Sequence, residues 1–195
     1  MCISVIGLGY VGLPLSLLLS KKDRVIGIDI DKKKINYLNL NKSYIERIEN
    51  KKIRNFNKKN IFSTDFSKIF ESDFIIICVP TPLKKDKSPD LSCIKNAVSK
   101  IKPNLKKGQT IILESTSYPG TTYDHVVKIL SKNFIVGKEI FVGFSSERID
   151  PGRNDNKIQT IPKVVSGYSK FCLEIISKFY EKYFIKIFKA DSLLI

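Results

Sequence analysis

The chain has 195 residues, of which 43% are hydrophobic and 27% charged, a composition typical of a soluble globular domain and not of a disordered segment. No apolar run approaches the roughly 20 residues that a membrane-spanning helix needs. The first apolar stretch, residues 3–20, is broken by glycine and proline and has no basic segment before it, unlike a signal peptide. The sequence therefore predicts no membrane partner and a cytoplasmic location.

The net charge is +15, from 34 basic against 19 acidic residues, and such an excess is compatible with a nucleic-acid partner. The lysines are scattered in KKD, DKKK, NKKN and KKG, whereas tracking of phosphates needs an ordered basic stripe. We expect no nucleic-acid partner, and a nucleic-acid binder stays the alternative that the charge alone supports.

The cysteines and the histidine are too few and too dispersed for a metal site. Cys2, Cys78, Cys93 and Cys172 form no CxxC pair, and His125 is the sole histidine. The sequence predicts no metal and no disulfide framework. Cys78 falls within an apolar run and is expected to be an inert packing residue, and no cysteine lies in a motif that lowers a thiol pKa.

Short β-rich apolar runs alternate with amphipathic segments along the chain, which is typical of βαβ units and a parallel sheet. In chain order, strands are expected at 2–6, 24–29, 74–79, 110–114 and 141–144, with two further candidates at 163–166 and 184–188. Helices are expected at 13–20, 32–39, 92–101, 123–131 and 169–183, and the lysine-rich stretch 50–60 as a solvated loop or short helix.

Several strands, such as FIIICV and TIILE, are apolar on both faces, as in a sheet that helices cover on each side. The fold class predicted is α/β: a Rossmann-like, doubly wound, mainly parallel sheet. Unusual loops, PTPLKKDKSPD, STSYPGTT and SSERIDPGRND, follow three of the strands. Ligands of such sheets bind beyond the carboxyl ends of the strands, so the site is expected among these loops.

A G-x-G-x-x-G pattern joins the first strand to the first helix, which is the context that a dinucleotide-binding motif needs. Gly7 permits the tight turn, Gly9 lets a pyrophosphate approach the backbone, and Gly12 lets the helix pack on the strand. The helix N-terminus then offers free N–H groups and a partial positive charge to the phosphates.

Asp29 ends the second strand, 17 residues after Gly12, close to the position of the acid that binds the adenosine ribose. A carboxylate there accepts from the ribose hydroxyls and repels a 2′-phosphate, which favours NAD over NADP. Asp31 is the alternative for this role. A flavodoxin-like domain without a nucleotide is the alternative for the motif as a whole.

Four motifs together carry a family resemblance: GLGYVGLPL; CVPTP followed by PDLS; LESTSYPGTT; and SSERIDPG followed by IPKVVSG. In this order and spacing, over about 185 residues, the chain resembles the UDP-glucose/GDP-mannose dehydrogenase family. The forms STSYPGTT and ERIDPG are most similar to the UDP-N-acetylglucosamine and UDP-N-acetylmannosamine 6-dehydrogenases. A 3-hydroxyacid-type dehydrogenase shares the glycine loop but would not explain these two motifs together.

The resemblance implies an NAD-dependent oxidoreductase that converts the C6 alcohol of a UDP-sugar to a carboxylate, for surface polysaccharide precursors. Two NAD are reduced, and a cysteine thiolate carries the intermediate as a thiohemiacetal and then a thioester. By position, the resemblance implies cofactor contacts at Gly7, Gly9, Tyr10, Val11, Gly12, Asp29, Lys34, Val79, Thr81 and Ser115. The alternative for Lys34 is a solvated helix lysine.

At the nicotinamide end of the site, the resemblance implies that Thr116 holds a water near the reacting carbon and that Glu147 acts with that water. Glu147 and Arg148 are also the implied substrate contacts. The alternative for Ser115 and Thr116 is a helix cap, and for Glu147 an ion pair with Arg148 or Arg153.

The predicted domain division is an NAD-binding dehydrogenase domain over residues 1–189 and a divergent tail over 190–195. In the family, the catalytic cysteine, the central helix and the C-terminal UDP-sugar domain lie beyond the first 200 residues. We therefore expect a truncated or split product that is inactive alone, with a separately encoded C-terminal half as a candidate partner and homo-oligomers among full-length relatives. A catalytically inert NAD-binding or sensing module is the alternative.

Overall fold

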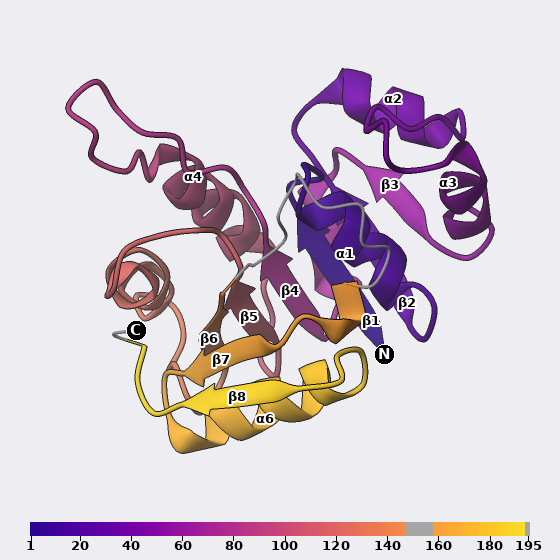
Figure 1. Cartoon of the computed structure of the whole chain (residues 1–195). Helices are drawn as coiled ribbons and strands as arrows, with labels where there is room; N and C mark the ends of the chain where they lie inside the picture. Colours follow the sequence, from indigo (N-terminus) through magenta and orange to yellow (C-terminus); the bar gives the residue numbers. More distant parts are fainter. Residues whose placement is uncertain (147–157, 194–195) are drawn as a thin grey trace.

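The computed structural model of the chain describes residues 1–146 and 158–193. Its centre is one eight-stranded sheet in the order β3-β2-β1-β4-β5-β6-β7-β8 (Figure 1). The strands are β1 (Cys2–Ile6), β2 (Arg24–Ile28), β3 (Ile61–Ser63), β4 (Phe74–Ile77), β5 (Thr110–Leu113), β6 (Phe141–Ser145), β7 (Lys163–Gly167) and β8 (Ile187–Ala190).

Neighbouring strands from β3 through β6 are all parallel. β7 runs antiparallel to β6, and β8 is parallel to β7. The chain moves outward from β1 to β3 on one side and then crosses back to build β4 to β8 on the other. This reversal beside β1 defines the doubly wound Rossmann-like fold, which confirms the predicted fold class.

Helices cover both faces of the sheet (Figure 1). The α-helices are α1 (Gly12–Leu19), α2 (Lys32–Asn39), α3 (Asn50–Phe56), α4 (Ser92–Ile101), α5 (Lys128–Leu130) and α6 (Lys170–Glu181). Short 3-10 helices occupy Phe66–Glu71, Lys102–Asn104 and Ile158–Thr160, and a π-helical turn, Tyr123–Val127, precedes α5.

Successive residues of the strands β1 to β5 enter two separate apolar clusters, one on each face of the sheet. In β1, Ile3 and Val5 belong to the cluster that α1 and α6 cover, whereas Cys2 and Ile6 belong to the cluster that α4 covers. Because a strand places successive side chains on opposite faces, a strand buried on both faces is mostly apolar, and the buried Ser4 of β1 has a hydrogen-bond partner in Ser72. Burial on both faces explains the apolar runs in the sequence.

The predicted elements differ from the structure at three places. The stretch 50–60 contains α3, in agreement with the short-helix alternative, but it is followed by a strand that the sequence did not reveal, β3, which is only three residues long. The expected helix 123–131 is a π-helical turn joined to one turn of α-helix. The last strand begins at Ile187 rather than at 184 because Phe184 is buried against α6, with its ring 5.7 Å from that of Tyr180. The predicted division at residue 189 stays a prediction.

Candidate nucleotide-binding site

The sheet topology brings the predicted loops to a single edge. β1, β2, β4, β5 and β6 run in the same direction, so their carboxyl ends meet there. The glycine loop follows β1, Asp29 follows β2, and the segments that begin at Cys78, Glu114 and Ser146 follow the other three strands. The position expected for a ligand of an open α/β sheet is therefore built from all of these segments.

The glycine loop has no room for side chains at two of its glycines. Gly7 has a φ of +89°, and a Cβ there would lie 2.7 Å from the carbonyl oxygen of Cys78. A Cβ on Gly12 would lie 1.8 Å from the carbonyl oxygen of Gly7. A Cβ on Gly9 would meet nothing within 4 Å. The loop is thus closely packed on its inner side and open at Gly9, the shape that a pyrophosphate needs.

The N-terminus of α1 keeps its hydrogen-bond donors available. Val11 precedes the helix and provides no side-chain cap. No acceptor among the described residues receives a bond from the backbone N–H of Tyr10, Val11 or Gly12. Unpaired N–H groups at the positive end of a helix form an anion site, so this end of α1 fits the phosphates of a dinucleotide.

Asp29 is bonded into the glycine loop. Its carboxylate, in a residue only 7% exposed, accepts from the backbone N–H of Leu8 at 2.8 Å and from that of Asp31 at 2.9 Å. The two oxygens have further lone pairs for ribose hydroxyls. Asp31, the alternative acid, instead caps α2 and accepts from the N–H groups of Lys33 and Lys34 at 2.8 and 3.3 Å.

Lys34 and Tyr44 complete this corner of the site. The Lys34 ammonium lies 3.7 Å from the Asp29 carboxylate and 5.8 Å from the centroid of the Tyr44 ring. The Tyr44 hydroxyl donates to the carbonyl oxygen of Leu8. Burial, and then the charges of Asp29 and Asp31, raises the pKa of Tyr44 above its usual value, so its phenol stays protonated as this donor.

Sequence reasoning did not find Tyr44. It lies beyond the C-terminus of α2, in the stretch NKSYIE, where no spacing rule links it to the glycine loop 36 residues earlier.

The loops after β4 and β5 are bonded to each other. The Thr81 hydroxyl donates to the carbonyl oxygen of Thr116 at 2.6 Å. Ser115 is buried, 4% exposed, and its hydroxyl donates to the carbonyl oxygen of Ile77 in β4 at 3.3 Å. Thr116 is exposed. At this end, therefore, Thr116 offers an open side chain, whereas the Ser115 hydroxyl is turned to the sheet.

Val79, in the loop after β4, packs closely against the glycine loop. A Cβ added to Gly7 would lie only 3.2 Å from the Val79 Cα. The remaining predicted residues, Glu147 and Arg148, lie outside the described residues, as does Arg153. Just before them, the Ser146 hydroxyl is buried and finds no hydrogen-bond partner among the residues that the structure describes.

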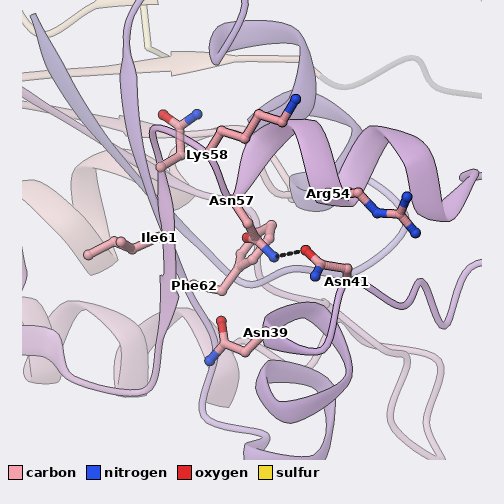
Figure 2. Close-up of a pocket in the computed structure, with 8 residues that line it drawn as sticks. Asn39, Asn41, Arg54, Asn57, Lys58, Ile61 and Phe62 are labelled. Carbon is pink, nitrogen blue, oxygen red and sulfur yellow. Dashed lines mark hydrogen bonds between the residues drawn. The ribbon is translucent and has the colours of Figure 1, made fainter.

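A hollow of about 550 Å³ lies elsewhere, between α2, α3 and β3 (Figure 2). Asn60 and Ile61, which line it, stand at the amino end of β3, the edge of the sheet opposite to the glycine loop. The Asn57 amide donates to the carbonyl oxygen of Leu38 at 2.7 Å and to the side chain of Asn41 at 2.9 Å. These amides join the end of α2 to α3, so they have a structural role there.

Metal and membrane features are absent from residues 1–146 and 158–193. No group of three or more His, Cys, Asp or Glu side chains there could hold a metal ion. None of the helices in this part of the chain combines the length and apolarity needed to cross a bilayer.

Comparison with known sequences identifies the same family of dehydrogenases that the four motifs resemble. The model of the UDP-glucose/GDP-mannose dehydrogenase family, NAD binding domain, matches residues 1–184. Protein CapL of Staphylococcus aureus is 38% identical over 180 residues, which cover 91% of this chain and 42% of that protein. The UDP-N-acetyl-D-glucosamine 6-dehydrogenase of Salmonella typhi is 34% identical over 200 residues, covering 98% and 45% respectively.

Solved structures agree. The UDP-N-acetyl-mannosamine dehydrogenase Cap5O of S. aureus superposes with a TM-score of 0.91 at 31% identity, over 99% of this chain and 47% of that one. A ternary complex of a Pseudomonas aeruginosa GDP-mannose dehydrogenase gives 0.88 at 26% identity, over 98% and 46%. The chain spans less than half the length of these relatives.

Proposed function

The chain belongs to the UDP-glucose/GDP-mannose dehydrogenase family, to whose NAD binding domain residues 1–184 correspond, and we propose that this domain serves the oxidation of a UDP-N-acetylhexosamine at C6. The cofactor is NAD, which accepts the hydride. The observation that carries the proposal is the Asp29 carboxylate hydrogen-bonded into a glycine loop that is open at Gly9. The choice of an N-acetylhexosamine rests on relatives whose names state that substrate class.

In the proposed binding mode, the pyrophosphate lies against Gly9 and the free N–H groups of Tyr10, Val11 and Gly12. Asp29 accepts from the adenosine ribose hydroxyls, and the Lys34 ammonium lies 3.7 Å from that carboxylate. A 2′-phosphate would bring a second negative charge to the Asp29 carboxylate, and this repulsion opposes NADP.

At the nicotinamide end, we assign the turn containing Val79 and Thr81 to the cofactor wall, with Ser115 as a backbone contact. The exposed Thr116 hydroxyl both donates and accepts, so it can orient a water at the reacting carbon. Glu147, as the base acting on that water, and Arg148, as a sugar-nucleotide contact, are assigned from the family resemblance alone.

Formation of a thioester requires an accessible thiolate, and the cysteines of this chain do not meet that requirement. Cys2, Cys78 and Cys172 are buried, and Cys93 is half-buried on α4. Cys78 lies under the glycine loop, with its carbonyl oxygen against Gly7. We propose that none of them carries the intermediate, so the second oxidation depends on a thiol from outside these 195 residues.

The test is calorimetric titration of the purified chain with NAD and with NADP. Binding of NAD with a clear preference over NADP is expected. Absence of NAD binding, or a preference for NADP, would contradict the cofactor assignment. Addition of a C-terminal half from a relative, with UDP-N-acetylglucosamine or UDP-N-acetylmannosamine, is expected to generate NADH that the chain alone does not produce.

The inert sensing module is not favoured, since the curated relatives with stated activities are dehydrogenases. A sensing module would bind NAD and yet produce no NADH with any C-terminal half. The same mixing experiment therefore separates the two functions.

A further inference from the structure

A buried carboxylate stands immediately before the loop that carries Thr116. Glu114 directly follows β5, is 1% exposed, and shares the strand face of Ile112, which belongs to the apolar cluster packed against α6. One oxygen of Glu114 bonds to the Lys163 ammonium, and the other accepts from the Tyr180 hydroxyl. An ionisable group therefore directly follows a buried strand in which Thr110 is the only polar residue.

The two partners come from elements far away in the sequence. Lys163 begins β7, and because β7 is antiparallel to β6, its first residue lies at the same sheet edge as the carboxyl ends of β5 and β6. Lys163 is 4% exposed, and its ammonium is 5.4 Å from the Tyr180 ring and 5.3 Å from the Phe184 ring. Tyr180 lies on α6, so three elements converge on one carboxylate.

The Tyr180 phenol stays protonated in this network. Burial, and then the charge of Glu114, raises the pKa of the Tyr180 phenol well above its usual value. The phenol therefore remains a donor, and the ammonium of Lys163 supplies the second donor. With each oxygen of Glu114 held from a different direction, the carboxylate has one orientation.

Stability alone is a poor explanation for this arrangement. Removing a carboxylate and an ammonium from water costs much of what their attraction returns, and apolar replacements of such pairs are often neutral or stabilising. The location is informative instead. The next residues are Ser115 and Thr116, and the far side of this turn is fixed by the bond from Thr81 to the Thr116 carbonyl.

We propose that Glu114, Lys163 and Tyr180 form a positioning network that fixes where the end of β5 presents Thr116 to the nicotinamide half of NAD. This inference rests on the proposed function, because it presumes that NAD lies along this edge. The network anchors the turn at its start, as Thr81 anchors it from the neighbouring loop. Loss of one anchor leaves the adenosine half of the site, at Asp29 and α1, untouched.

The chain offers a matched control for a test. Tyr183, just beyond α6, also donates its hydroxyl to a carboxylate, that of the partly buried Asp23. Asp23 directly precedes β2 and therefore lies at the amino ends of the strands, away from the nucleotide edge. Tyr180→Phe and Tyr183→Phe each remove one phenol-to-carboxylate bond, and they differ in which edge of the sheet they affect.

The experiment measures calorimetric dissociation constants for NAD and for ADP-ribose, which lacks the nicotinamide. Tyr180→Phe is expected to weaken NAD binding roughly three- to tenfold, about the loss of one hydrogen bond, and to leave ADP-ribose binding unchanged. Tyr183→Phe is expected to preserve the NAD to ADP-ribose ratio. The double variant Glu114→Gln, Lys163→Met removes both charges and is expected to reproduce the selective loss.

Equal effects of Tyr180→Phe on both ligands, no effect on either, or the same ratio as Tyr183→Phe would overturn the positioning role. If the unaltered chain bound neither NAD nor ADP-ribose, the proposed function itself would fail. That outcome is distinguishable, because it appears before any substitution is made.

Discussion

Asp29 and Asp31 are two residues apart, yet their carboxylates do different things. Asp29 accepts from Leu8 in the glycine loop, whereas Asp31 accepts from the first N–H groups of α2. The first acid links two strand ends at the site, and the second only begins a helix. This separation allows selectivity for the cofactor to be altered without disturbing the cap.

Asp29→Asn is expected to lower NAD affinity roughly tenfold, since one charged acceptor for the ribose is lost. The same substitution should narrow the preference over NADP because the repulsion of the 2′-phosphate disappears. Asp31→Asn is the control, since asparagine is an equally good N-cap. Calorimetric titration with both cofactors checks the ratio, and an unchanged ratio in Asp29→Asn would contradict the assignment of the ribose site.

His125 gives a prediction for the dependence of stability on pH. Burial, and then the neighbouring charge of Lys95, lowers the pKa of this imidazole below its usual value, and Asp124 opposes the shift only in part. The folded chain therefore holds His125 neutral at a pH where the unfolded chain protonates it, near a pH of about 6.5. Its contribution to stability is present above that pH and declines as the pH falls below it.

Titration of the sole histidine by NMR should show a pKa below that of a free imidazole. His125→Asn should remove this part of the acid destabilisation in urea unfolding curves measured between about pH 7 and 5. An identical pH profile in the variant would contradict the shift.

At the scale of elements, β1, the glycine loop and α1 behave as one interlocked piece. α1 is apolar on almost every side because the sheet lies beneath it and α3 beside it, with Leu13, Leu15 and Leu19 fully buried. The first turn of α1 can pack against the glycine loop only because Gly12 has no side chain. Stability and cofactor binding can therefore be separated at adjacent glycines.

Gly12→Ala is expected to lower the free energy of unfolding by about 2 kcal/mol or more, because its Cβ must displace the backbone of Gly7. Gly9→Ala is expected to leave the unfolding midpoint nearly unchanged, since a Cβ there meets nothing within 4 Å. It should nevertheless abolish NAD binding, as the methyl group occupies the space of the pyrophosphate. Thermal unfolding with and without NAD checks both the stability and the NAD binding of each variant. Retained NAD binding in Gly9→Ala would contradict the placement of the pyrophosphate against Gly9.

The elements that the sequence predicted well are those whose signals are local. α2 and α4 have their expected bounds because their apolar spacing and end residues suffice to define them. β3 was not predicted because three residues are too few to show the alternation of apolar and polar side chains that identifies a strand. The bonds of Glu114 join residues 49 and 66 apart in the chain, and no local pattern encodes such partners.

At the scale of the whole molecule, the reactivity of the four cysteines tests whether any thiol is accessible enough to act as a nucleophile. Native chain treated with a thiol reagent such as DTNB should show slow reaction of Cys93 and negligible reaction of the buried Cys2, Cys78 and Cys172. Cys93→Ser should remove the slow phase, and unfolding should release the other three thiols. A fast-reacting thiol that NAD protects would contradict the proposal that the reactive cysteine comes from elsewhere.

The sheet order also has a consequence for biosynthesis. β1 lies between β2 and β4, and β4 ends only at Ile77. During synthesis, β1 must therefore stay without one of its two partner strands until the chain has been made as far as Ile77. Deletion of Cys2–Ile6 would remove an interior strand and not merely shorten one edge, so β2 and β3 would be separated from β4 and the rest of the sheet.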